Sequence, residues 1–139
     1  MISDEDLISL AKVARTRSYA PYSRFTVGAA LVTAGGRVFT GANIENAAYS
    51  PSVCAERVAF FTALHAGARD FSAIAVVGGA AGEPLRSFTA PCGVCRQVMR
   101  EFCADGFRVL MTDGEQIRET TLGALLPESF SPDNLRENG

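Results

Sequence analysis

The sequence predicts an α/β fold in which helices pack on a mixed sheet. Segments with the apolar spacing of helices alternate along the chain with segments typical of buried strands. Asp113-Gly114 is a strong hairpin turn, which favours an antiparallel pair of strands near the end of the chain. No linker, repeat or shift in composition divides the 139 residues, so one domain spanning residues 1–139 is expected.

The N-terminal half is expected to contain a helix, a strand hairpin and a second helix. Ser3 precedes three acidic residues, which is typical of a capped helix start, and Pro21 blocks continuation of that helix. The predicted core face of this first helix consists of Leu7, Leu10, Ala11 and Ala14. Residues 25–33 and 38–43 are predicted as a strand hairpin, and residues 54–65 as the next helix.

The C-terminal half is expected to supply the rest of the sheet and a third long helix. Its predicted elements are a short strand over 74–77, a helix over 92–103, strands over 107–112 and 116–120, and a short helix over 122–126. Together with the hairpin, these segments give five strands. The predicted helices over 54–65 and 92–103 both begin at a cysteine, and this placement carries the functional argument.

Composition excludes several classes of function. The chain is 47% hydrophobic and 20% charged with a net charge of −2, and no stretch gathers Lys or Arg as a nucleic-acid groove requires. No apolar run is long enough to span a membrane, so no membrane partner is expected. The first ten residues hold three acids and no basic residue, unlike a signal peptide. A cytoplasmic location is therefore predicted, where paired cysteines indicate metal or redox chemistry more often than disulfides.

Three cysteines and one glutamate indicate a catalytic zinc site. Cys92 and Cys95 are three residues apart and share one helix face, and Cys54 would join them from a second helix start. Helix N-termini favour thiolate, the form of cysteine that binds metal. Three protein ligands leave a fourth position for water. Glu56, separated from Cys54 by Ala55, is not a ligand and is free to move protons.

Three thiolates and one zinc ion carry a net charge of −1, which would weaken the pull of the metal on water. Arg57 directly follows Glu56, and Arg96 directly follows Cys95. Of the two, we expect Arg57 to donate hydrogen bonds to the ligand sulfurs. Cys103 is predicted to be a small core residue. His65 lies at the far end of its helix, roughly 15 Å from the cysteines at the usual rise per residue.

The sequence resembles the small, homotetrameric cytidine deaminases over nearly its whole length. The resemblance lies in Tyr19-Ala20-Pro21-Tyr22-Ser23-Arg24-Phe25, Gly41-Ala42-Asn43-Ile44-Glu45-Asn46-Ala47-Ala48-Tyr49, Cys54-Ala55-Glu56-Arg57, Pro91-Cys92-Gly93-Val94-Cys95-Arg96-Gln97, and Leu125-Leu126-Pro127 with Phe130. A proline before Cys-x-x-Cys and a glutamate that is not a ligand belong to the zinc deaminase signature. Ala90 departs from the many relatives that carry serine before this proline, so any hydroxyl contact there is lost.

The resemblance implies a three-layer fold, with a mixed five-stranded sheet and helices on both faces. It implies zinc-dependent hydrolysis of cytidine and 2′-deoxycytidine in pyrimidine salvage, with one zinc ion per subunit on Cys54, Cys92 and Cys95 and Glu56 as the proton shuttle. The implied substrate contacts are the side chains of Phe25, Asn43 and Glu45, the backbone of Ala55 and the carbonyl of Pro91. Tyr49 and Phe130 are expected to reach the site of a neighbouring subunit in a homotetramer.

Four alternatives remain at this stage. A deaminase of the blasticidin type would keep the metal motifs without needing Asn43 and Glu45, and a polynucleotide deaminase would need a basic groove. A structural zinc module would need a fourth protein ligand, for which Cys103, His65 or a carboxylate would have to serve. A dithiol oxidoreductase using Cys92 and Cys95 would leave Cys54 and Glu56 without a role.

Overall fold

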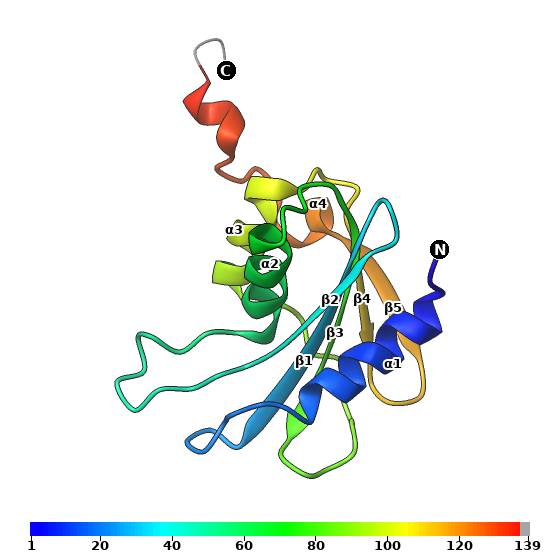
Figure 1. The fold of residues 1–139 in the computed structure, drawn as a ribbon, viewed down its shortest axis with the longest axis vertical. Helices are drawn as coiled ribbons and strands as arrows, with labels where there is room; N and C mark the ends of the chain where they lie inside the picture. The colour runs from blue at the N-terminus through cyan, green and yellow to red at the C-terminus, as the bar shows by residue number, and fades with distance from the viewer. Residues whose placement is uncertain (137–139) are drawn as a thin grey trace.

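The computed structural model describes residues 1–136 and confirms the predicted α/β architecture. Four α-helices, five strands and one short 3₁₀ helix follow one another along these residues (Figure 1). They are α1 (Asp4–Arg15), β1 (Phe25–Thr33), β2 (Val38–Ala42), α2 (Ala55–His65), β3 (Phe71–Ala80), α3 (Gly93–Phe102), β4 (Arg108–Thr112), β5 (Ile117–Thr121), α4 (Leu122–Leu125) and η1 (Pro132–Leu135).

The five strands form one sheet in the order β2-β1-β3-β4-β5, so β2 and β5 are its edges. Only β3 and β4 pair in parallel, and α3 makes the crossover between them. The other neighbours are antiparallel, including the predicted β4–β5 hairpin through Asp113-Gly114. The sheet is therefore mixed, as the sequence predicts.

Helices cover both faces of the sheet, which gives three layers (Figure 1). Alternation along the strands sorts the side chains, so that Leu31 and Ile74 face α2 and α3 whereas Ala30 and Ala75 face α1. Small residues on the α1 side allow that helix to lie very close to the sheet. A Cβ atom on Gly28 would approach the carbonyl oxygen of Ala11 to 2.0 Å.

Two predictions from the sequence are wrong, one about the core face of α1 and one about the length of β3. Leu10 is 37% exposed and Ile8 is buried in its place, because the backbone of Ala11 and Arg15 abuts Gly28 and turns Leu10 away from the sheet. The strand predicted over 74–77 extends over Phe71–Ala80. Gly78 and Gly79 predict the end of the strand after Val77, yet both glycines pair with β1 in the sheet.

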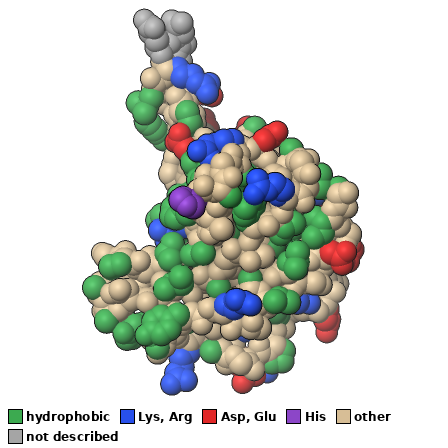
Figure 2. Space-filling view, viewed as in Figure 1, with side chains coloured by type: hydrophobic (Ala, Val, Ile, Leu, Met, Phe, Trp, Pro, Cys, Tyr) green, Lys and Arg blue, Asp and Glu red, His purple; other side chains and the backbone are tan. Residues whose placement is uncertain are grey.

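Two segments project from the three layers (Figure 1). Residues 43–54 extend from the end of β2 before the chain returns to α2, and η1 stands away from the body at the other end. Figure 2 shows hydrophobic side chains gathered over the first projection, where Ile44 and Tyr49 are exposed. None of the helices within residues 1–136 is long and apolar enough to cross a membrane.

Candidate active site

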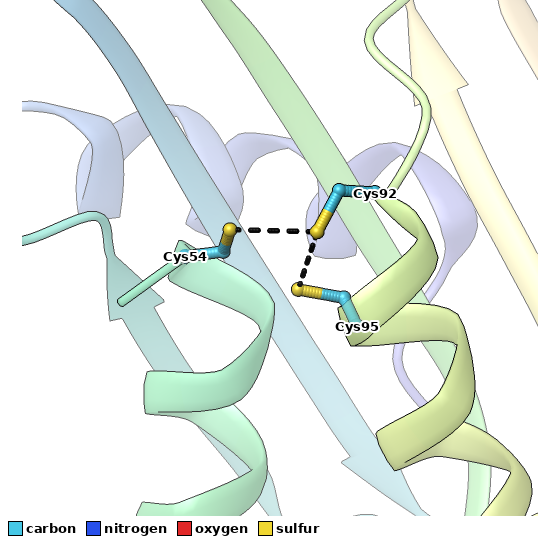
Figure 3. Close-up of side chains that lie close together, drawn as sticks. All are labelled: Cys54, Cys92 and Cys95. Carbon is cyan, nitrogen blue, oxygen red and sulfur yellow. Dashed lines mark hydrogen bonds between the residues drawn. The ribbon is translucent and has the colours of Figure 1, made fainter. Parts of the chain in front are cut away.

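The three predicted cysteine ligands come together at the N-termini of two helices. Cys54 is the N-cap of α2, Cys92 is the N-cap of α3, and Cys95 lies in the first turn of α3 (Figure 3). The sulfur of Cys92 lies 3.7 Å from that of Cys54 and 3.5 Å from that of Cys95. Neither N-cap sulfur caps its own helix by a hydrogen bond to a backbone N–H, so both sulfurs point to the cluster instead.

The three sulfurs fit one tetrahedral zinc ion. Zinc–sulfur bonds of about 2.3 Å in a tetrahedral site place ligand sulfurs about 3.8 Å apart, close to the separations found here. Within residues 1–136, no fourth histidine, cysteine or acidic side chain joins the cluster. These residues therefore do not form a closed structural site with four protein ligands. They provide three ligands and leave the fourth coordination position open.

Electrostatics around the cluster favour negative charge on sulfur. The pKa of Cys54 falls to about 5, first because the Cys95 thiol bonds to it and then because Arg57 does. The pKa of Cys95 rises, because its proton is held by Cys54 and its side chain is buried. The shift at Cys54 favours its thiolate, the form of cysteine that binds metal.

Arg57, rather than Arg96, is the guanidinium at the sulfurs. Its Nη2 donates to the Cys54 sulfur at 3.5 Å, and its pKa is raised by the sulfur partners. Its Nε is buried and has no hydrogen-bond partner among the described residues. Arg96 turns away and donates to the carbonyl oxygens of Pro91 and Leu125. The position of Arg57 agrees with the predicted compensation of thiolate charge.

Glu56 is the buried carboxyl of the site. Its side chain is only 4% exposed, and burial is the main cause that raises its pKa to about 7, with the negative charge of Cys54 also raising it. A carboxyl with this pKa exchanges protons readily near neutral pH. Such a residue two positions beyond a metal ligand has the properties of a general acid–base group.

A cavity of about 420 Å³ joins this carboxyl to the predicted sugar-binding residues. Asn43 and Glu45 lie along the same cavity as Cys54, Cys92 and Glu56, and Phe25 at the start of β1 adds an aromatic side chain. Arg57 lines the cavity as well. The lining residues that were not identified from the sequence as site residues are Ser23, Val27, Ser52, Val53, Thr89 and Ala90. Ser23 lies within the Pro-Tyr-Ser-Arg-Phe motif, and this motif is the sequence signal that could have identified it as a site residue.

The two polar residues of the cavity also hold its walls in place. The Asn43 amide accepts a hydrogen bond from the Val27 backbone N–H and donates one to the Phe25 carbonyl, both at 2.8 Å. The Glu45 carboxylate accepts from the backbone N–H groups of Tyr22 and Ser23 and from the Ser23 hydroxyl. These bonds lower the pKa of Glu45, so the cavity carries a carboxylate at this end.

The other predicted substrate contacts are not among the residues that line this cavity. Ala55 occupies the first position of α2, where backbone N–H groups have no acceptor within the helix. Pro91 is buried, and its carbonyl oxygen already accepts from Arg96 at 2.7 Å. Tyr49, 72% exposed, and Phe130, 51% exposed, are both outside the cavity of this chain.

The remaining cysteine and the single histidine lie outside the metal cluster. Cys103 forms the C-cap of α3 and packs against the core, where burial raises its pKa to about 12, which confirms its predicted packing role. His65 is the last residue of α2, at the end opposite the cysteines. Neither residue completes a fourth coordination position.

Comparison with known proteins identifies the family. Residues 1–111 match the cytidine and deoxycytidylate deaminase zinc-binding region. A cytidine deaminase from Sporosarcina psychrophila is 48% identical over 94% of this chain and 93% of its own length. A blasticidin-S deaminase from Bacillus cereus is 30% identical over 94% of this chain and 95% of its own length.

A solved structure agrees with the sequence relatives. The crystal structure of cytidine deaminase from Burkholderia pseudomallei superimposes with a TM-score of 0.83 at 49% identity, covering 93% of this chain and all of the other. The chain belongs to the cytidine and deoxycytidylate deaminase family of zinc enzymes.

Proposed function

We propose that this chain hydrolyses cytidine and 2′-deoxycytidine to uridine and 2′-deoxyuridine and releases ammonia. The observation that carries the proposal is the position of Glu56, a buried carboxyl that lines one cavity together with two of the clustered cysteines and with Asn43 and Glu45. The cytidine deaminases among its relatives support the choice of substrate.

Cys54, Cys92 and Cys95 would hold the zinc ion. When bound, zinc supplies the Lewis acidity that makes water nucleophilic near neutral pH. Arg57 donates to the Cys54 sulfur and offsets part of the thiolate charge, which limits how far the three sulfurs weaken that acidity.

Glu56 moves the protons of the reaction. It accepts a proton from the attacking water and delivers it to N3 of the pyrimidine as the water oxygen bonds to C4. It then carries the second water proton to the amino group, which leaves as ammonia when the C4–N bond breaks. The pKa of about 7 suits both directions of transfer.

The cavity walls bind the nucleoside. Asn43 and Glu45 contact the ribose hydroxyls, for which an amide and a carboxylate are suitable partners. Phe25 packs beside the pyrimidine, and the free N–H at Ala55 contacts the base. The Pro91 carbonyl has a second lone pair for the base, since Arg96 occupies only one.

The assembled enzyme is proposed to be a homotetramer of single-domain chains, each comprising residues 1–139, with active sites shared between subunits. Tyr49 and Phe130 are exposed aromatic side chains outside their own cavity, which supports contacts with a neighbouring copy. A cytoplasmic location would keep the cysteine ligands reduced. We propose that the reaction serves pyrimidine salvage, since its products are uridine and 2′-deoxyuridine.

The test is to follow cytidine by ultraviolet absorbance and to measure ammonia with the zinc-loaded protein. We expect cytidine and deoxycytidine to be consumed, a chelator to stop the reaction and added zinc to restore it. Blasticidin S serves as the comparison substrate. Preference for blasticidin S, or full activity after complete zinc removal, would contradict the proposal.

A further inference from the structure

Polar side chains of α3 fix the segment that follows α4. Gln97 Nε2 donates to the Phe130 carbonyl at 2.9 Å, and Arg100 Nε donates to the Ser129 hydroxyl at 2.7 Å. Arg100 also reaches the Leu126 carbonyl at 3.3 Å, and Arg96 reaches that of Leu125 at 2.8 Å. One helix thus holds residues 125–130 at four points along their length.

Leu125 and Leu126 pack against the core, but apolar burial does not account for the position of the segment beyond them. Phe130 and Leu135 are exposed, and open cavities of about 520 Å³ and 420 Å³ lie between residues 128–136 and α3. Figure 1 shows the chain leaving the body of the molecule here. The hydrogen bonds from α3 are therefore the main contacts that fix the direction of the segment.

One of the donors, Arg100, is itself held firmly. Arg100 has a side chain only 10% exposed and forms an ion pair with Asp105 at 2.7 Å. Between two of the bonds to Arg100, Glu128 adopts a positive φ of 46°, a conformation that side chains other than glycine rarely take. Such a conformation persists where surrounding contacts determine it, and here the bonds at Leu126 and Ser129 do so.

The same helix carries two of the metal ligands. Gln97 lies two residues beyond Cys95, so the bond from Gln97 to Phe130 relates the backbone of the segment directly to the cysteine cluster. Arg96 joins the carbonyl before Cys92 to the end of α4. These bonds therefore fix the segment relative to the helix that carries two metal ligands of the same chain.

We infer that Gln97, supported by Arg96 and Arg100, is a positioning residue that sets where the exposed ring of Phe130 stands. This inference rests on the proposed function, in which Phe130 completes the site of a neighbouring copy. In that assembly Gln97 touches no substrate and acts on the reaction only through Phe130.

The test combines hydrogen exchange with a double-mutant cycle. In zinc-loaded Gln97→Ala, we expect exchange of the hydrogen-bonded amides of Leu126 and Ser131, which flank the segment, to become about fivefold faster, as loss of one hydrogen bond implies. KM for cytidine should rise by a similar factor with kcat and zinc content unchanged. Ser129→Ala, which removes an acceptor without altering α3, should act in the same direction. Glu101→Ala, on the same helix beside the same cavities, is the matched control and should change neither quantity.

The cycle decides whether Gln97 acts through the ring. In a Phe130→Ala background, adding Gln97→Ala should raise KM no further. Unchanged exchange in Gln97→Ala, or a KM effect that persists without the ring, would overturn the inference. Failure of the proposed function is distinguishable, because it would appear as a wild-type chain that does not deaminate cytidine, or as Phe130→Ala with wild-type KM. The exchange measurement remains decisive for the inference in either case.

Discussion

Gly41 of β2 lies directly against Ala55, the first residue of α2. A Cβ atom on Gly41 would approach the Ala55 carbonyl oxygen to 2.4 Å and the Ala59 nitrogen to 2.6 Å. Backbone atoms cannot move aside as a flexible side chain can. The absence of a side chain on Gly41 therefore sets how closely α2, and with it Cys54 and Glu56, approaches the sheet.

Gly41→Ala should displace α2 and damage both stability and metal binding. Overpacking of this kind typically costs about 1–3 kcal/mol, measured here by urea unfolding, and zinc content should fall with it. Gly106→Ala is the matched control, since a Cβ atom there meets nothing within 4 Å. Equal stability of the two variants would contradict the role of this contact.

Glu56→Gln should abolish turnover while leaving the metal in place. The amide preserves the size of the side chain but cannot carry the protons, so kcat should fall by at least about 10⁴-fold. Metal analysis by mass spectrometry should find the same zinc content as in the wild type. Glu115→Gln, at an exposed turn, serves as the control. Near-normal turnover of zinc-loaded Glu56→Gln would show that another group moves the protons.

Arg57→Ala should weaken zinc binding. The substitution removes the donor to the Cys54 sulfur, and loss of such a partner of a metal ligand typically costs about 10–100-fold in affinity. Competition against a chromophoric chelator measures the change. Arg57→Lys, which keeps the charge, should lose less, so identical affinities for all three proteins would rule out this contribution.

Substitutions of Asn43 and Glu45 should differ in their effect on stability, although both should raise KM. Asn43→Ala leaves the Phe25 carbonyl and the Val27 N–H without their partner, so it should cost about 1–3 kcal/mol of stability as well as raising KM. Glu45→Gln removes an exposed charge, so it should raise KM about tenfold with little change in unfolding. Steady-state kinetics and thermal unfolding of both variants test the contrast. Equal losses of stability would contradict it.

Glu119 should contribute pH-dependent stability. Arg108 bonds to this carboxylate and lowers its pKa below 4.5, so the pair stabilises the fold above that pH and its contribution is lost as the pH falls through the folded pKa. Both groups are substantially exposed, which limits the contribution to about 1 kcal/mol. Urea unfolding of Glu119→Gln and wild type should therefore differ at pH 7 and converge in acid, whereas a constant difference would exclude this pair as the cause.

Local sequence patterns predict the parts of the structure that local physics determines. The N-cap at Ser3, the hairpin at Asp113-Gly114 and the helices that begin at Cys54 and Cys92 all follow from neighbouring residues. The cysteine trio could be predicted because two ligands share a helix and the third begins another. These features need little knowledge of tertiary packing.

Contacts between distant segments could not be predicted in the same way. The choice of Ile8 over Leu10 depends on how α1 meets Gly28, and the contribution of Thr89 to the cavity depends on its hydroxyl donating to the Gly78 carbonyl. The dual role of Asn43, which binds β1 as well as lining the cavity, likewise requires the folded sheet. The spacing of residues in the sequence does not indicate these contacts between distant segments.

The exposed edge at β5 has a consequence for handling the protein. Free backbone groups at a sheet edge can recruit a strand from another molecule, which leads to aggregation. Here the edge strand is five residues long and places Arg118 over the Phe88 ring at 3.9 Å and Glu119 beside Arg108. An incoming strand would have to bury these charges, so this edge resists fibril-like association when the protein is concentrated.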